Sequence, residues 1–198
     1  MTMMMERPQP IQPTGEPGFE ELCQTLETMD VPVGFRAEII RGGIVLSPWS
    51  QGFYLNIMDS LADQLAPHAP KGHRVSQAPC LYEFPHQSRA FGPDVHVADR
   101  EAVELASSRL PGDALSLVAE LTSRATADND RRDKVERYGM AGIPVYILVD
   151  MLLAKVVVFS SPTANGYKAQ DEIKFGETIH VPAPFDCELD TSDWKAKP

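Results

Sequence analysis

Residues 114–150, ALSLVAELTSRATADNDRRDKVERYGMAGIPVYILVD, contain the pattern that decides the fold of this 198-residue chain. Ala114 to Thr122 is an apolar run of strand length, and Val145 to Asp150 is a second one. Between them, Asp128 to Ala141 begins in a polar cluster and ends at Gly142, which is typical of a helix. A strand, a helix and a second strand in this order predict a parallel βαβ crossover.

Hairpins are expected on both sides of this unit. Phe35 to Ile40 and Gly43 to Pro48 are apolar runs around a glycine-containing turn, and Ala154 to Ser160 follows Val145 to Asp150 after a short turn. The other expected elements are helices over Gly18–Met29 and Ser50–Ala66, strand-like segments over His73–Phe84 and Asp94–Ala98, and short strands and loops over Lys168–Trp194. Hairpins combined with a crossover predict an α/β fold with a mixed sheet.

The length predicts one domain, because domains usually contain about 100–200 residues. We expect this domain to span residues 18–198, with a motif core over 35–160 and acidic strands over 168–194. Residues 1–17 carry four prolines and few apolar side chains besides the methionines, so they are expected to form a flexible tail.

The acidic composition limits how the chain can bind nucleic acid. It has 28 Asp and Glu residues against 18 Lys and Arg residues, a formal net charge of −10. Such a balance argues against a protein that holds nucleic acid mainly by bulk charge. Seven acids and one lysine between Asp171 and Asp193, however, account for −6 of this charge, outside the expected motif core. A nucleic-acid substrate therefore stays compatible with the composition, with weak, salt-sensitive and metal-dependent binding expected.

Cysteine usage and hydropathy exclude several other classes of protein. The three cysteines lie far apart and form no CxxC pair, which argues against a disulfide framework or a zinc site of the usual spacing. No apolar stretch has the length of a signal peptide core or of a bilayer span. We therefore expect a cytoplasmic protein without a membrane partner.

Two acids and a lysine stand where a charge is unexpected. Glu120 interrupts an apolar strand, Asp94 opens another strand, and Lys134 shares a helix face with Tyr138. Two carboxylates on neighbouring strands suit Mg²⁺, which takes one or two carboxylates besides water and phosphate oxygens. Lys134 would then orient or deprotonate the attacking water, or offset charge in the transition state. Glu38, in the first hairpin, is a further candidate for the shell of the metal.

Each of these residues also has a simpler interpretation. Glu120 fits an ordinary acid at the rim of a sheet, and Glu38 fits an exposed hairpin residue. Lys134 can pair with Asp130 one helical turn earlier, a surface contact worth about 0.3–0.5 kcal/mol. Taken singly, Glu120 leaves the two interpretations equally open, whereas Glu38 alone favours the exposed hairpin residue and Asp130 is most simply the partner of Lys134.

Together, the motifs form an ordered series from Glu38 to Asp150. The series consists of Glu38-Ile-Ile-x-Gly, Pro93-Asp94, Glu120-Leu-Thr-Ser, the helix with Asp130, Lys134 and Tyr138, Gly142-Ile-Pro, and Tyr146-x-Leu-Val-Asp150. It resembles the putative restriction endonuclease family, a bacterial branch of the PD-(D/E)XK nuclease superfamily. The resemblance implies a restriction-endonuclease-like core with flanking helices and added β-hairpins. It also implies that Asp94 and Glu120 bind Mg²⁺, that Glu38 contributes an acid and that Lys134 is the catalytic lysine.

Two positions depart from the pattern of this resemblance. The superfamily lysine normally stands two residues after the second acid, where this chain has Thr122. In the resembled family the following helix supplies the lysine, which matches Lys134. Tyr54 stands about where family members often carry a histidine, and no role is assigned to it.

Two functional hypotheses follow. The first is a Mg²⁺-dependent endonuclease that hydrolyses DNA phosphodiester bonds, with Mn²⁺ as a substitute metal. The second is a catalytically weak or inactive nuclease-like scaffold or interaction module, which the acidity and the missing histidine favour. RNA as the substrate and a homodimer as the assembly stay open, because the same fold and metal chemistry serve several functions.

Overall fold

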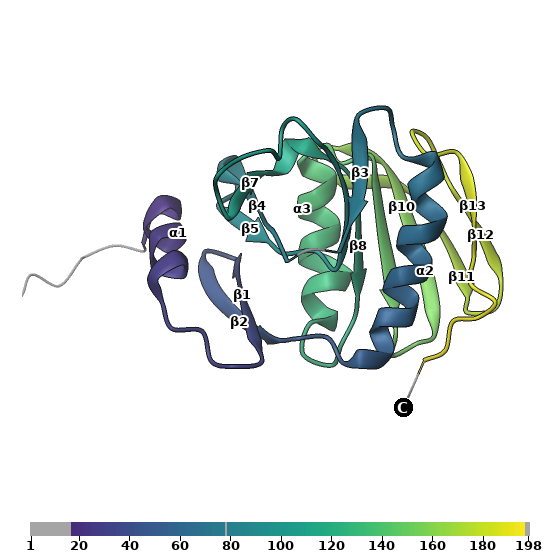
Figure 1. The fold of residues 1–198 in the computed structure, drawn as a ribbon, viewed down its shortest axis with the longest axis horizontal. Coiled ribbons are helices and arrows are strands. Elements are labelled where there is room, and N and C mark those ends of the chain that lie inside the picture. The colour runs from purple at the N-terminus through teal and green to yellow at the C-terminus, as the bar shows by residue number, and fades with distance from the viewer. Residues whose placement is uncertain (1–16, 78, 197–198) are drawn as a thin grey trace, which may run out of the picture.

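The computed structural model describes residues 17–77 and 79–196. The tail expected to be flexible, residues 1–17, therefore lies outside the described residues except for Pro17. Two β-sheets and three α-helices make up most of the described chain (Figure 1).

The larger sheet has six strands in the order β11-β10-β9-β8-β6-β3. Its strands are β3 (His73–Ser76), β6 (Val95–Asp99), β8 (Leu115–Leu121), β9 (Val145–Asp150), β10 (Lys155–Thr163) and β11 (Gly166–Lys174). Within this sheet β8 and β9 pair in parallel, and α3 (Lys134–Met140) lies between them in the sequence. The predicted βαβ crossover and the hairpin of β9 and β10 are therefore confirmed.

The smaller sheet has the strand order β2-β1-β5-β4-β7, and a separate hairpin follows β11. The bounds are β1 (Phe35–Ile40), β2 (Gly43–Pro48), β4 (Leu81–Phe84), β5 (Arg89–Phe91) and β7 (Arg109–Pro111), with β12 (Thr178–Val181) and β13 (Cys187–Asp190) in the hairpin. Helix α1 (Phe19–Thr28) packs on β1 and β2. Short helical turns connect several of these elements: η1 (Gly52–Tyr54), η2 (Ala66–His68), η3 (Pro85–Gln87) and η4 (Gly112–Ala114).

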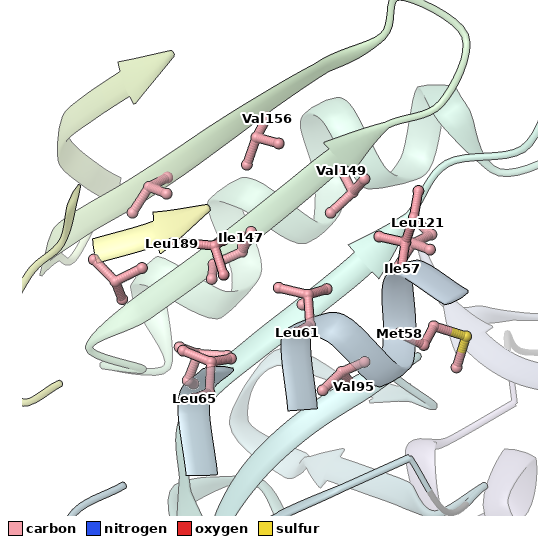
Figure 2. Close-up of a cluster of buried hydrophobic side chains, with 14 of the residues drawn as sticks. Ile57, Met58, Leu61, Leu65, Val95, Leu121, Ile147, Val149, Val156 and Leu189 are labelled. Carbon is pink, nitrogen blue, oxygen red and sulfur yellow. The ribbon is translucent and has the colours of Figure 1, made fainter. Parts of the chain in front are cut away.

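Alternate residues of the central strands face opposite sides of the larger sheet. Val95, Leu117, Leu121 and Ile147 point to the side covered by α2 (Leu55–Leu65). Figure 2 shows Ile57, Leu61 and Leu65 of α2 packed over this side. The period of two in the strands and the four-residue spacing in the helix produce one continuous apolar layer.

The opposite side of the same sheet carries an aromatic layer under α3. Val118, Tyr146 and Phe159 of the sheet pack with Tyr138 of α3 in one buried cluster. Glu120 lies two residues after Val118 on β8, so its side chain points to this side as well. A carboxylate is thus directed at the buried face of α3.

The mixed α/β fold is as predicted, but three local expectations need correction. The segment His73–Phe84 forms two strands, β3 and β4, which belong to different sheets. The helix expected over Ser50–Ala66 begins only at Leu55, after the turn η1, which contains Gly52, a poor helix former. The expected helix over Asp128–Ala141 contains a π-helical turn, η5 (Asn129–Asp133), directly before α3.

Candidate active site

Asp94 and Glu120 lie side by side at one end of the larger sheet. The segment Gly92-Pro93-Asp94 leads from β5 of the smaller sheet into β6 of the larger one. Val95 pairs with Ala119, so Asp94 falls beside the end of β8. The backbone N–H of Leu121 donates to Asp94 Oδ2 at 2.8 Å, which ties the Asp94 carboxylate to the strand that carries Glu120.

Lys134 occupies the centre of the site. Its Nζ lies 2.9 Å from Glu120 Oε1, 3.2 Å from Glu38 Oε1 and 3.3 Å from Asp130 Oδ1. The side chains of Lys134, Glu38 and Glu120 are each 1% exposed. The sequence hypotheses that put Glu38, Glu120 and the Lys134–Asp130 pair at the surface are therefore wrong.

Glu38 lies on β1 of the smaller sheet, and its side chain reaches this cluster from the hairpin of β1 and β2. Glu38 pairs with Val45 across the hairpin, and the backbone N–H of Gly92 donates to Glu38 Oε1 at 2.9 Å. Glu38 therefore contacts both the segment that leads to Asp94 and the ammonium of Lys134. One carboxylate of the smaller sheet is thus joined to α3 and to the segment that enters the larger sheet.

Tyr138 completes the environment of Glu120. The Tyr138 hydroxyl donates to Glu120 Oε1 at 2.8 Å, the same oxygen that Lys134 contacts. Tyr138 and Lys134 lie four residues apart on one face of α3, as the helical spacing predicts. The aromatic rings of Phe91 and Tyr146 pack against Tyr138 and close the site on the side of α3.

Arg36 is the second cation of the site, and the sequence analysis did not identify it. Its Nη1 donates to Asp94 Oδ1 at 3.0 Å and to the Gly92 carbonyl at 2.8 Å. Arg36 precedes Glu38 by two residues on β1, so both side chains lie on one face of the strand. This period of two was the signal in the sequence that would have identified Arg36.

The charges of the cluster do not balance. Four carboxylates, Glu38, Asp94, Glu120 and Asp130, face two cations, Arg36 and Lys134, so two negative charges are uncompensated when all six groups are ionised. Burial is the largest cause that raises the pKa of Glu120, Lys134 opposes it, and the charges of Asp130, Asp94 and Glu38 add to it, so that the pKa lies at about 8. The cluster therefore favours the uptake of positive charge.

Two further acids of the cluster, Asp130 and Glu38, respond differently to the same surroundings. Burial raises the pKa of Asp130, and Lys134 only partly opposes this. Burial would also raise the pKa of Glu38, but Lys134, Arg36 and the Gly92 N–H outweigh it and lower the pKa.

For Lys134, burial alone would lower the pKa, but Glu120, Glu38 and Asp130 outweigh it and raise the pKa. Lys134 is consequently an ammonium and no proton acceptor in this arrangement.

The donor chemistry of the cluster fits a hard divalent cation. Carboxylate oxygens are the ligands that Mg²⁺ and Mn²⁺ prefer, and two uncompensated negative charges match one such ion. Asp130 Oδ1 is buried and accepts no hydrogen bond from any described residue, although Lys134 Nζ lies 3.3 Å away. No three His, Cys, Asp or Glu side chains between residues 17 and 196, residue 78 apart, are preassembled for a shared metal ion. Asp94 and Glu120 thus have the oxygen atoms that a divalent cation prefers. In this structure, however, protein cations occupy them: Arg36 contacts Asp94 and Lys134 contacts Glu120.

Tyr54, which stands about where members of the resembled family often carry a histidine, is buried beside the site. Its hydroxyl donates to the Thr122 carbonyl at 3.0 Å. Thr122, where the superfamily lysine normally stands, donates to Asp150 Oδ1 at 3.4 Å. Neither of these two hydrogen bonds involves one of the four carboxylates of the cluster. The cluster is therefore held together without Tyr54 and Thr122.

Comparison with known proteins agrees with this architecture. The family Uma2, described as "Putative restriction endonuclease", matches residues 19–192. The crystal structure of a putative nuclease belonging to DUF820 from Anabaena variabilis ATCC 29413 has a similar fold, with a TM-score of 0.67. It is 14% identical in sequence, and the alignment covers 89% of this chain and 98% of that one.

Two further observations complete the comparison. No curated protein matches the chain. In the described part of the chain, each helix is too short or too polar to cross a lipid bilayer. Because the family match extends over most of the sequence, from the first helix to beyond the last strand, this protein belongs to the putative restriction endonuclease family.

Proposed function

We propose that this protein is a divalent-metal-dependent endonuclease that hydrolyses phosphodiester bonds in DNA. The observation that carries the proposal is the convergence of Glu38, Glu120 and Asp130 on the Lys134 ammonium, with Asp94 at the adjacent strand end. Buried acids around a buried lysine are costly for stability, since each charge loses its hydration. A catalytic role would explain why the chain keeps this costly arrangement, and membership of a family of putative restriction endonucleases supports nuclease activity as that role.

Asp94 and Glu120 are the proposed ligands of Mg²⁺, with Mn²⁺ as a substitute. Such an ion would polarise the phosphodiester and lower the pKa of a bound water. Glu38 holds the segment before Asp94 through the Gly92 N–H and would keep Asp94 in position. Lys134, as an ammonium, would orient the attacking water and offset negative charge on the phosphorus oxygens in the transition state.

In the reaction, the water oxygen forms a bond to phosphorus while one P–O ester bond breaks. The leaving oxygen takes up a proton, and the water loses one, so that a phosphate monoester and a hydroxyl result. Lys134 can donate a hydrogen bond but cannot accept the proton of the water while three carboxylates surround it. Of the roles that the sequence suggested for Lys134, orientation and charge compensation are therefore the ones we propose.

The proposal is tested by incubating the purified full chain with supercoiled plasmid and with circular single-stranded DNA. Mg²⁺ or Mn²⁺ should be required, and Asp94→Asn, Glu120→Gln and Lys134→Met should each lower the cleavage rate by at least about 100-fold. Asp113→Asn, an exposed acid outside the cluster, is the matched control and should leave the rate unchanged. Cleavage that survives Asp94→Asn and Lys134→Met at full rate would refute this site.

A nuclease-like scaffold without activity is the second candidate, and one observation favours it. Asp94 and Glu120 already have cationic protein partners, Arg36 and Lys134, so the fold does not need a metal to compensate them. Calorimetric titration with Mn²⁺ distinguishes the two candidates. Binding that Asp94→Asn and Glu120→Gln abolish supports the nuclease, whereas the scaffold predicts no binding at these residues.

A further inference from the structure

A cavity of about 90 Å³ opens beside the four-carboxylate cluster. Arg36, Trp49, Tyr54 and Thr126 line it together with Leu121, whose N–H binds Asp94. A larger hollow of about 710 Å³ adjoins it, since the two share Pro48, Gln51, Tyr54 and Ser123 as lining residues. The two hollows form one continuous groove between the β2–α2 connection and the segment after β8, and its inner end is lined by Arg36 and Leu121, which both contact Asp94.

Arg36 places a guanidinium at the inner end of this groove, paired with Asp94 but with spare hydrogen-bonding capacity. Its Nη1 is engaged by Asp94 and the Gly92 carbonyl, but its Nε is buried and donates to no described residue. A buried guanidinium N–H without an acceptor is unfavourable, so a ligand in the groove that brings an acceptor to Arg36 gains a hydrogen bond that the protein alone does not make. A phosphate oxygen is the acceptor that matches a guanidinium best.

Trp49 supplies an aromatic surface in the same groove. Its side chain lines the 90 Å³ cavity together with Arg36 and is 49% exposed. Trp49 follows β2 directly, and its backbone N–H donates to the Gly34 carbonyl, which fixes the position of the residue at the base of the hairpin. A large aromatic side chain that is half-exposed and held on a fixed backbone is suited to stacking against another ring.

We propose that Arg36 and Trp49 form a subsite for one unpaired nucleotide of single-stranded DNA. Arg36 binds its phosphate and Trp49 stacks on its base. The inference rests on the proposed nuclease function and specifies the substrate of that site. It also assigns Arg36 a positioning role, because a phosphate held by Arg36 lies next to Asp94, 3.0 Å from the guanidinium.

An unpaired nucleotide fits these residues better than intact duplex DNA. In a duplex both faces of each base are covered by neighbouring base pairs, so Trp49 would have no ring to stack on. Duplex binding also relies on many phosphate contacts, for which a chain of net charge −10 offers little basic surface. Stacking is less dependent on bulk charge, and single-strand binders combine it with a few cationic contacts.

The two tryptophans of the chain make the subsite directly observable. Trp194 is 5% exposed and contacts Phe175 and Ser60, whereas Trp49 is half-exposed in the groove. Short oligothymidylate, added with Ca²⁺ in place of Mg²⁺ and Mn²⁺ so that the carboxylates are compensated without cleavage, should quench the fluorescence of the full chain. Trp49→Phe, in which only Trp194 remains as a strong emitter, should show no quenching. A signal that persists unchanged in Trp49→Phe would overturn the subsite.

Affinities for a labelled oligothymidylate, measured by fluorescence anisotropy, test the contributions of both residues. Trp49→Ala should weaken binding by between about 5-fold and 150-fold, the range for the loss of one base–aromatic stack, and Trp49→Tyr should restore most of it. Arg36→Met should weaken binding and reduce its salt dependence, whereas Arg132→Met, at an arginine that is 79% exposed, should do neither. Equal affinity for the single strand and for a duplex of the same length would contradict the inference.

The outcome separates this inference from the proposed function. Quenching through Trp49 without metal-dependent cleavage by the full chain supports the subsite and refutes the nuclease. Metal-dependent cleavage with an affinity that Trp49→Ala leaves unchanged supports the nuclease and refutes the subsite. Variants are compared only after thermal unfolding has shown that they fold, and Trp49→Tyr tests the stacking surface without disturbing the buried cluster.

Discussion

Lys134 Nζ lies 2.9 Å from Glu120 Oε1, and both side chains are buried. Glu120 is the penultimate residue of the first strand of the βαβ crossover, and Lys134 begins its helix, so the crossover itself brings the two charges together. The fold thereby buries an ion pair next to two further carboxylates, an arrangement that contributes little to stability by itself. What it does provide is a fixed ammonium at the end of the central strands.

Lys134→Met is expected to destabilise the protein by about 3–5 kcal/mol. The substitution keeps the length of the side chain but leaves Glu38, Glu120 and Asp130 buried without their common cation. The free energy of unfolding, measured by urea denaturation at pH 9, above the raised pKa of about 8 of Glu120, checks this value. The double variant Lys134→Met/Glu120→Gln should recover part of the loss, because it removes one uncompensated charge. A double variant no more stable than Lys134→Met would contradict the coupling of the two residues.

Tyr138→Phe is expected to lower the free energy of unfolding by about 1–3 kcal/mol. The variant keeps the packing of the ring against Phe91 but removes the hydrogen bond to the buried Glu120 carboxylate. Tyr146→Phe is the matched control, since its hydroxyl donates to a neutral acceptor, the Asp130 carbonyl. A smaller loss, about 0.5–1.5 kcal/mol, is expected there. Equal losses in the two variants would mean that the Tyr138 contact gains nothing from the charge of Glu120.

Local patterns in the sequence predicted the crossover and both hairpins. Each of these units is formed by elements that follow one another in the chain, so the spacing of apolar residues within a short segment was sufficient to identify it. The assignment of strands to two sheets was not predictable in this way. His73–Phe84 reads as one strand-like segment, but β3 pairs with β6 and β4 pairs with β5 and β7, pairings that distant residues decide. The turn η5 was equally hidden, since a π-helical turn leaves no distinct apolar period.

The candidate site was predictable where a charge interrupted an apolar pattern, as at Glu120 and Lys134. Asp130 and Arg36 were harder to identify, because each stands in a segment where a charge is ordinary. Asp130 was interpreted as a surface partner of Lys134, but its own side chain is buried and lies among the acids. Their catalytic and metal-binding roles stay predictions, which the cleavage and binding experiments test.

Asp150 is expected to make stability depend on pH in the acidic range. It accepts two hydrogen bonds from Arg131, at 2.7 and 2.8 Å, and further ones from the backbone N–H groups of Leu152 and Leu153. Burial alone would raise the pKa of Asp150, but these contacts outweigh it and lower the pKa. The unfolded state then binds the proton more readily than the folded state does. The stabilisation is therefore complete above the ordinary pKa of about 3.9 and is lost as the pH falls through the lowered value.

Asp150→Asn tests this expectation, since it keeps the shape of the side chain and removes the charge. At pH 7 the variant should be less stable than the wild type by about 1.5–3 kcal/mol, and the difference should shrink below about pH 4. Urea denaturation over a series of pH values measures it. The exposed Asp113→Asn control should stay within about 0.5 kcal/mol of the wild type throughout. A difference for Asp150→Asn that does not change with pH would show that the charge of Asp150 is not responsible.

Mn²⁺ is expected to raise the Tm of the full chain, because a ligand that binds only the folded state stabilises it by mass action. At a metal concentration of 100 times the Kd, the gain in the free energy of unfolding should be about 2.7 kcal/mol. Asp94→Asn and Glu120→Gln should each abolish the gain if the two carboxylates on neighbouring strands share the ion. Arg36 and Lys134 contact these carboxylates in the structure, so binding must displace them at least in part and should become tighter in Arg36→Met. A Tm that rises equally in the wild type and in Asp94→Asn would place the metal away from the Asp94–Glu120 pair.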